Sequence, residues 1–341
     1  MRIALTIAFT LLAAILGLPS SVLSSTARVD REPAPLRGVP LRGATGLRLV
    51  VADKPPFVLD VDTGRVTPVP AVRPQSRGTV RVVGVGGRAA IVVASAVYRH
   101  AGLYAVHGRA ARVSELGTGW DVVPAPDGRS VWVKRFVNAG RCTLRQLGLD
   151  GQAIGASRAF PCASTISPAG SLGVVVSRTR VFDPRTGRTL LRTRWGVVAA
   201  AGRTLVLAGP NNAFTVLDTA TGVQQRLPWP RTVGGLDAPA VDPRGRFVAL
   251  AFAAPASQTL DVWLLETKTG HLRQLPGMPA LVALKSTSMA WTDDGQLVLL
   301  GESGGRDVVA VWRPGQKSLA VKSLGLPERG DSGSDSFAPV G

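Results

Sequence analysis

The 341-residue sequence predicts an all-β fold, a seven-bladed β-propeller of four-stranded antiparallel blades. The first observation is a repeat in which a glycine, a short link and an apolar strand recur, and a spacing of about 40 to 45 residues is typical of a propeller blade. The glycines that open these strands are Gly46, Gly87, Gly128, Gly170, Gly202, Gly245 and Gly295.

A second marker recurs in phase with the first. A later strand of each repeat ends in a tight turn, read as LDVDTG at Gly64, FDPRTG at Gly187, LDTATG at Gly222 and LETKTG at Gly270. Asp and Thr side chains can bond their own backbone in such a turn while Gly takes a positive φ, so the segment predicts a hairpin. A β-sandwich also has short strands and turns. It needs no fixed period, so two markers in phase favour the propeller.

The turns before the repeat strands carry a family resemblance. The best preserved are Ala125–Arg129 (APDGR), Ser167–Gly170, Asp242–Arg246 and Thr292–Gly295. They resemble the S-P-D-G-R turn of TolB-like propeller repeats, relatives of the WD-repeat blade, from about Gly43 to Leu326. The resemblance implies the fold. It does not extend to a role in an envelope translocation complex, because the segment before the first blade is too short for the additional α/β domain of TolB.

The chain divides into four predicted segments. Residues 1–24 have the charged, apolar and small-residue order of a secretory signal peptide, and the apolar run is shorter than a membrane span requires. Residues 25–43 form an extended linker, 44–326 the propeller, and 327–341 a flexible tail or a clasp that closes the ring. The inner strand of the first blade comes either from LRGVPLRG before Gly46 or from the C-terminal SFAPV. We therefore expect a secreted or extracytoplasmic protein of the cell envelope with no membrane span after cleavage.

The two cysteines are predicted to form a disulfide. Cys142 begins the third strand of the third blade, and Cys162 follows the fourth strand. Neighbouring antiparallel strands bring these positions together, and an oxidising compartment lets the thiols pair. Two buried free thiols are the alternative.

The net charge of +18 attracts polyanions in general. Nucleic-acid readers usually concentrate their charge on one element, whereas the arginines here are spread through every blade. We expect a monomer whose partner is a protein or an anionic envelope polymer, and no specific nucleic acid.

The working face is predicted from the loops. With the strands of a blade named a to d, the b–c and d–a loops share one face and are richer in polar residues than the opposite turns, and such loops often carry function. The predicted basic, aromatic-edged binding face consists of Arg99, His100, Trp120, Arg135, Asn138, Arg141, Arg178, Trp195, Asn211, Asn212 and Trp229. The alternative is that the tryptophans cover blade edges and the arginines are merely solvated.

No catalytic constellation, metal site or cofactor motif is predicted. His100 and His107 fall at opposite ends of one strand, and the nucleophile-like GESGG at Gly301–Gly305 has no histidine after it. The sequence therefore favours an exported, non-catalytic propeller that binds or scaffolds an envelope protein or anionic ligand. The alternative is a propeller-type hydrolase, lactonase or lyase with a channel site, for which Asp121, Asp237, Asn211 and Glu302 stay open.

Overall fold

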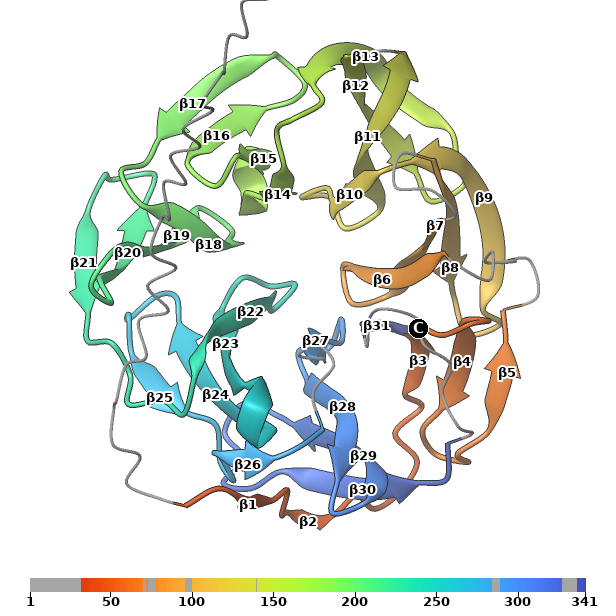
Figure 1. Cartoon of the computed structure of the whole chain (residues 1–341), viewed down its shortest axis with the longest axis vertical. Helices are drawn as coiled ribbons and strands as arrows, with labels where there is room; N and C mark the ends of the chain where they lie inside the picture. The colour runs from red at the N-terminus through yellow and green to blue at the C-terminus, as the bar shows by residue number, and fades with distance from the viewer. Residues whose placement is uncertain are drawn as a thin grey trace, which may run out of the picture.

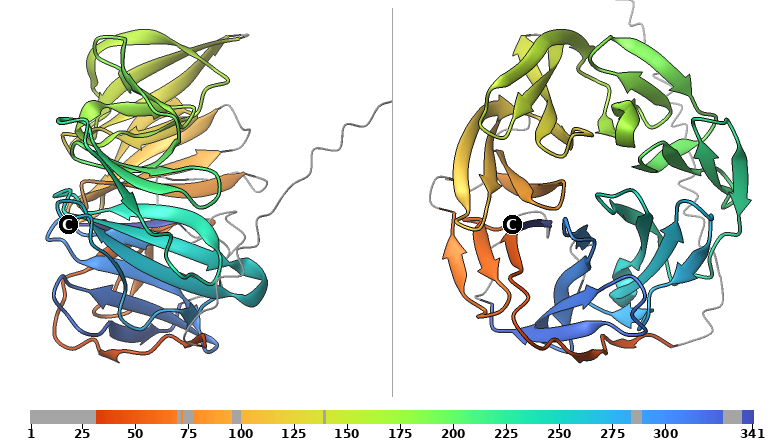
Figure 2. Two further views of the ribbon diagram at one scale, coloured as in Figure 1. Left: turned by 90° about the vertical axis from the view of Figure 1, so that its left-hand side faces the viewer. Right: turned by 180° about the vertical axis from the view of Figure 1, so that it is seen from behind.

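Seven antiparallel sheets stand around a central axis in the computed structural model, which describes residues 32–69, 72, 78–95, 100–138, 140–283, 289–326 and 336–341. Figure 1 looks down that axis, and the left view of Figure 2 shows the ring from its side. Each sheet has a core of four strands, named a to d from the centre outward. The predicted seven-bladed propeller is confirmed.

The first four blades have the following strands in the order a to d. Blade 1 contains β31 (Phe337–Val340), β3 (Arg48–Val51), β4 (Phe57–Asp60) and β5 (Val66–Pro68). Blade 2 contains β6 (Thr79–Val85), β7 (Ala89–Ser95), β8 (Ala101–His107) and β9 (Arg112–Gly119). Blade 3 contains β10 (Asp121–Pro124), β11 (Ser130–Asn138), β12 (Arg141–Gly148) and β13 (Ala153–Pro161). Blade 4 contains β14 (Ile166–Pro168), β15 (Val174–Val176), β16 (Arg180–Asp183) and β17 (Arg188–Arg192).

The remaining blades include short additions. Blade 5 contains β18 (Gly196–Ala201), β19 (Thr204–Ala208), β20 (Phe214–Asp218) and β21 (Gln224–Leu227). Blade 6 contains β22 (Gly235–Val241), β23 (Phe247–Ala254), β24 (Thr259–Glu266) and an outer strand in two parts, β25 (Leu272–Gln274) and β26 (Ala280–Leu281). Blade 7 contains β27 (Met289–Trp291), β28 (Leu297–Ser303), β29 (Arg306–Trp312) and β30 (Ala320–Leu324). Two single 3₁₀ turns, η1 (Gly170–Leu172) and η2 (Pro255–Ser257), lie in blades 4 and 6.

The inner strand of blade 1 comes from the C-terminal segment. Strand β31 pairs antiparallel with β3, with Phe337 opposite Val51 and Val340 opposite Arg48. Phe337 packs into the cluster shared with blade 7, and Val340 into the cluster shared with blade 2. Of the two origins considered for this strand, SFAPV supplies it. Figure 1 shows β31 beside β3 at the centre of the ring, and residues 327–335 lie outside the described residues.

The other terminal segment covers the outside of two blades. Strand β1 (Ala34–Pro35) pairs parallel with β26, and β2 (Val39–Pro40) pairs parallel with β30, so residues 34–41 form an N-terminal strap along blades 6 and 7. The sequence predicts an extended linker here and offers LRGVPLRG as one candidate for the inner strand of blade 1, but the segment pairs with the outer strands of blades 6 and 7 instead. Proline is tolerated at a sheet edge because its missing N–H can face away from the ladder. The predicted signal peptide and residues 25–31 lie outside the described residues.

Two backbone bonds fasten the strap to blade 7. The N–H of Val39 donates to the carbonyl of Leu319 at 2.9 Å, and the N–H of Leu41 to that of Val321 at 2.9 Å. Gly38 allows this approach, because a Cβ there would lie 2.4 Å from the Leu319 oxygen. The strap is therefore seated closely on the outer strand.

The core lies between blades, where apolar side chains of adjacent sheets meet. Between blades 6 and 7, for example, Trp291 stacks on Phe247 with an interplanar angle of 12° and meets Trp312 edge-on. Within the described residues no helix is long and apolar enough to span a membrane.

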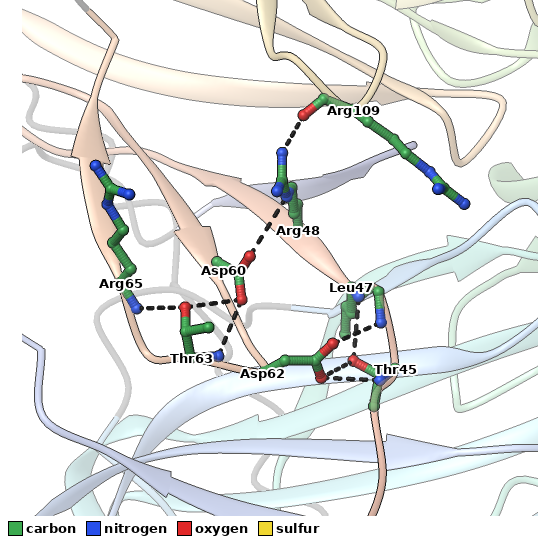
Figure 3. Close-up of polar contacts among 9 residues, drawn as sticks. Thr45, Leu47, Arg48, Asp60, Asp62, Thr63, Arg65 and Arg109 are labelled. Atoms are coloured by element: carbon green, nitrogen blue, oxygen red, sulfur yellow. Dashed lines mark hydrogen bonds and ion pairs between the residues drawn. The ribbon is translucent and has the colours of Figure 1, made fainter.

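The predicted c–d turns have the expected chemistry. In blade 1 the N–H of Gly64 donates to the carbonyl of Asp60 at 2.8 Å, and the Asp60 carboxylate accepts bonds from the backbone and hydroxyl of Thr63 (Figure 3). The same glycine-to-Asp bond recurs at Gly187 and Gly222, and Gly270 donates in the same way to Glu266. The bond from the Thr63 backbone is the largest cause that lowers the pKa of Asp60.

The a–b turns of blades 2 and 7 meet directly. Blade 1 has no a–b turn, because its inner strand comes from the other end of the chain. A Cβ on Gly87 would lie 2.4 Å from the backbone nitrogen of Asp293, and Arg88 Nε lies 3.0 Å from the Asp293 carboxylate. On the face that carries the a–b turns, blades 2 and 7 therefore contact each other at the place where blade 1 lacks its turn, although they are not neighbours in the ring.

Candidate binding face

The predicted surface residues that fall in the described part of the chain come from b–c and d–a connections or the strand ends beside them. The topology therefore places them on one face of the ring, which we call the loop face. They form two groups, one on blades 2 and 3 and the other on blades 4 and 5. Arg99 lies outside the described residues.

The first group is built on the β11–β12 hairpin of blade 3. The sequence predicts a loop at RFVNAGRC, but β11 continues to Asn138 and β12 begins at Arg141, so the strands leave only two residues between them. A register shift between Phe136 and Asn138 ends the regular pairing. Arg141 Nε donates to Asn138 Oδ1 at 2.9 Å, which holds the arginine beside the hairpin tip.

A buried lysine on β11 connects this hairpin to the segments packed beside it. The side chain of Lys134 is only 1% exposed, and its Nζ lies 2.7 Å from an Asp121 carboxylate oxygen. The same ammonium donates to the carbonyls of Ser164 at 2.7 Å and Cys162 at 3.3 Å. It also lies 4.2 Å from the ring centroid of Trp120. A buried charge is tolerated only when it is paired and hydrogen-bonded, and Lys134 meets both conditions.

The disulfide fixes the same connection. Cys142 and Cys162 are bonded, as predicted, with their Cα atoms 5.1 Å apart. The bond joins the start of β12 to the connection between blades 3 and 4, whose carbonyls accept the Lys134 bonds. The base of the Arg141 hairpin is therefore held covalently and by a buried ion pair.

Aromatic and cationic side chains gather around this base. His100 meets Phe136 edge-on with 5.8 Å between ring centroids. Arg135, half-buried, lies against blade 2, where its Nη2 would be 3.8 Å from a Cβ at Gly117. The carbonyl of Trp120 accepts a 2.8 Å bond from Arg81. The structure thus brings together five predicted residues, namely His100, Trp120, Arg135, Asn138 and Arg141.

The second group has a clear structural basis of its own. Arg178 takes φ +67°, and its carbonyl accepts the N–H of Val197 at 2.7 Å. The Trp195 ring lies flat on Gly209, where a Cβ would come within 2.7 Å of it. Asn211 and Asn212 have φ values of 55° and 56° in the β19–β20 turn, a conformation that asparagine tolerates well. Turn geometry therefore accounts for these two asparagines without a ligand.

Trp229 occupies a core position. Its ring meets Phe214 and Phe252 edge-on, with centroid distances of 5.8 and 5.5 Å. Its indole Nε1 is buried and has no hydrogen-bond partner among the described residues. The ring therefore packs between blades 5 and 6.

The charge on the first group is unbalanced. Within the described residues, no carboxylate lies within 4 Å of the guanidinium groups of Arg135 and Arg141, whereas Asp121 is already paired with Lys134. The exposed Val137, 57% accessible, adds an apolar surface at the hairpin tip. Sequence reasoning did not select Lys134, Phe136 or Val137. The signal that β11 continues to the tip is the recurrence of strand-favouring Val, Trp and Phe through SVWVKRFVN.

The four positions considered for a channel enzyme are spread over blades 3, 5, 6 and 7. Asp121 is paired with Lys134, and Asn211 lies in the blade 5 turn. Glu302 on β28 stands opposite Asp307 on β29 in the strand register. Asp237 is exposed on β22. In the described segments, no three His, Cys, Asp or Glu side chains are placed to hold a metal ion.

Comparisons with known proteins identify the architecture. No family model and no curated protein matches the sequence. The propeller domain of the Trilobed protease from Pyrococcus furiosus is 10% identical, with a TM-score of 0.54 over 88% of this chain and 98% of that one. The shared feature is the fold. A putative 6-phosphogluconolactonase from Bacteroides fragilis is 11% identical, with a TM-score of 0.54 over 88% of this chain and 99% of that one. TolB from Acinetobacter baumannii is 14% identical, with a TM-score of 0.46 over 88% of this chain and 67% of that one.

Proposed function

We propose that the protein is a non-catalytic, extracytoplasmic propeller that binds an anionic partner, a protein or an envelope polymer, on the loop face of blade 3. The observation that carries the proposal is the pair Arg135 and Arg141, which have no carboxylate partner among the described residues and stand on a rigid base. Unpaired guanidinium groups bind carboxylates and phosphates in two-pronged geometry. A disulfide also supports an oxidising compartment.

The base of the hairpin favours recognition of an anionic partner. Binding costs less when the groups that contact the partner are already held in place. Here the disulfide and the Lys134 ion pair fix the strands, and the Asn138 bond fixes Arg141. His100 and Phe136 supply aromatic surface beside the charges.

The test compares two double variants with the same change of net charge. Arg135→Glu with Arg141→Glu alters the loop face, while Arg65→Glu with Arg112→Glu alters two exposed arginines on the opposite face. Fluorescence anisotropy with labelled poly-L-glutamate measures binding at low and physiological salt. We expect the loop-face variant to bind at least about tenfold more weakly than the control.

An equal loss in both variants would show that binding follows total charge and would overturn this site. Hydrolysis of 6-phosphogluconolactone by the purified chain would instead favour the hydrolase alternative. Crosslinking from an envelope fraction, with both variants beside the wild type, would then identify the natural partner.

A further inference from the structure

The outer edges of the blades differ in how they are protected. An outer strand presents unpaired N–H and C=O groups, and proteins usually blunt such edges with bulges, proline or a covering segment. The register shifts in β9, β13 and β17 disrupt the edges of blades 2, 3 and 4. Strand β5 ends in Pro68, and the N-terminal strap covers β26 and the first two residues of β30.

Strand β21 of blade 5 lacks all of these devices. Its four residues, Gln224–Leu227, pair with β20 in an unbroken register and contain no proline. Residues 223–226 are exposed, and Val223 is 63% accessible. Among the described outer strands of four or more residues, β21 alone is regular and uncovered.

The pairing pattern shows which backbone groups are free. The N–H of Asp218 bonds the carbonyl of Val223 at 3.0 Å, and bonded pairs alternate along an antiparallel ladder. The backbone groups of Gln224 and Arg226 therefore point away from β20. No hydrogen bond to either residue's backbone comes from beyond β20 within the described segments. Two donors and two acceptors are thus available on this edge.

The same molecule shows how an outer edge is filled. Strands β1 and β2 each add only two residues to the outside of a blade, and two backbone bonds seat β2 on blade 7. The free edge of β21 is as long as both additions together. An extended segment has room to add there in the same way, by the strand-addition mode used in peptide recognition.

The charges on and beside β21 indicate which kind of extended segment would add to this edge. Arg226 on β21, Arg192 at the end of β17 and Lys268 in the β24–β25 turn are exposed. The carboxylates of Asp218 and Glu266 in the adjoining turns accept turn hydrogen bonds and keep their negative charge, so these three cations outnumber the two carboxylates. A second copy of this chain would place Arg226 of each β21 close together, and like charges facing across strands are destabilising.

We propose that β21 is a second docking site, which accepts an extended acidic segment of a partner protein by adding a strand to blade 5. The site is separate from the loop face of blade 3. Its side chains favour acidic residues toward Arg226 and apolar residues beside Val223.

A defined peptide tests the proposal. The probe is fluorescein-labelled EVEVEVE, with KVKVKVK and a fully N-methylated EVEVEVE as controls, measured by anisotropy against the full chain. Gln224→Pro removes one outward N–H without changing charge or the bonds to β20, and Gln224→Ala is its matched control. Arg226→Glu tests the charge requirement.

We expect EVEVEVE to bind, Gln224→Ala to match the wild type, and both Gln224→Pro and Arg226→Glu to bind at least about tenfold more weakly, as loss of a backbone bond or a charge contact predicts. The N-methylated peptide should not bind. Hydrogen exchange of the Gln224 and Arg226 amides should slow when EVEVEVE is added.

Several results would overturn the site. The first is that EVEVEVE does not bind at about 1 mM. The second is that it binds Gln224→Pro as tightly as wild type, or that the N-methylated peptide binds as tightly as EVEVEVE. The third is that binding of EVEVEVE is lost only in the Arg135→Glu with Arg141→Glu variant. The last result would place the peptide on the loop face. If Gln224→Pro fails to fold, the N-methylated peptide and the hydrogen-exchange measurement still test whether the peptide binds the backbone of β21. Dimerisation of the free chain through β21 would also contradict the proposal.

Discussion

Blades 6, 7 and 1 are held together differently from blades 3, 4 and 5. In the first arc, which we call the closure arc, the N-terminal strap pairs with β26 and β30, and β31 pairs with β3, so both chain ends contact strands far away in sequence. In the second, the open arc, each blade is made from one continuous stretch of chain and its outer strand is exposed. The ring is thus closed on one side, while both proposed docking sites lie on the other.

The largest effect should come from removing the clasp. Deletion of residues 337–341 takes Phe337 and Val340 out of two inter-blade clusters. Burial of two such side chains stabilises by about 3 to 6 kcal/mol. We expect a clearly lower urea midpoint, while deletion of Gly341 alone, which removes one backbone bond to Arg88, should have a much smaller effect. An unchanged midpoint after the larger deletion would contradict the distinction between the two arcs.

The second-largest loss of stability should come from removing the disulfide, which is the covalent constraint of the open arc. Cys142→Ala with Cys162→Ala releases a disulfide that spans 20 residues. Closing a loop of this size contributes about 3 kcal/mol in the chain-entropy model. The variant should unfold at lower urea and respond no further to reductant, whereas the wild type should lose stability when reduced. Equal wild-type midpoints with and without reductant would disprove this contribution.

A smaller effect tests the strap. Gly38→Ala forces a Cβ to within 2.4 Å of the Leu319 oxygen. Overpacking of this kind costs about 1 to 3 kcal/mol. Gly301→Ala in blade 7 is the matched control, because nothing lies within 4 Å of its Cβ position. If both variants have the same urea midpoint, the strap does not hold the closure arc.

The smallest effects should appear in the pH dependence of stability. Desolvation opposes ionisation of Asp183 in the open arc, but bonds from Thr186 and Arg185 outweigh it and lower its pKa. A carboxyl whose pKa is lower in the folded state stabilises that state at pH values above its unfolded-state pKa of about 3.9. This contribution is lost as the pH falls through the folded-state pKa. Asp183→Asn should therefore be less stable than wild type near neutrality, and the difference should shrink in acid.

The pKa of Asp261 in the closure arc is shifted in the opposite direction, so its contribution to stability changes with pH in the opposite sense. Burial raises its pKa, against bonds from Gln274 and Trp263. The folded state then binds its proton more tightly than the unfolded chain, so wild-type stability falls as the pH rises from about 3.9 through the raised pKa. Relative to Asp261→Asn, the wild type should lose stability over that rise. Urea titrations at several pH values measure both differences, and the same sign for both would refute this account.

Local chemistry explains why the repeat could be predicted. The turn from Asp60 to Gly64 closes on its own backbone and side chains, so its five residues contain the whole signal. The disulfide also followed from the register, because Cys142 lies at the start of β12 and Cys162 directly after the end of β13, the neighbouring strand. Features whose partners lie within one repeat are therefore recoverable from the sequence.

Features that depend on distant partners were harder to predict. The strap pairs through two-residue strands with residues more than 200 positions later, and nothing within Ala34–Pro40 indicates those partners. Lys134 reads as a solvated charge until Asp121 and the carbonyl of Ser164 are brought to it. Trp229 likewise follows a polar strand end, and only the neighbouring blade shows that it packs in the core.

The origin of β31 has a consequence for synthesis of the chain. A ribosome has made six complete blades before it makes the strand that finishes the first one. Until residue 340 has left the exit tunnel, β3 lacks its inner neighbour and presents an unpaired edge. A translation product that stops before residue 337 therefore keeps that edge open, and an open strand edge is a template for pairing with another chain.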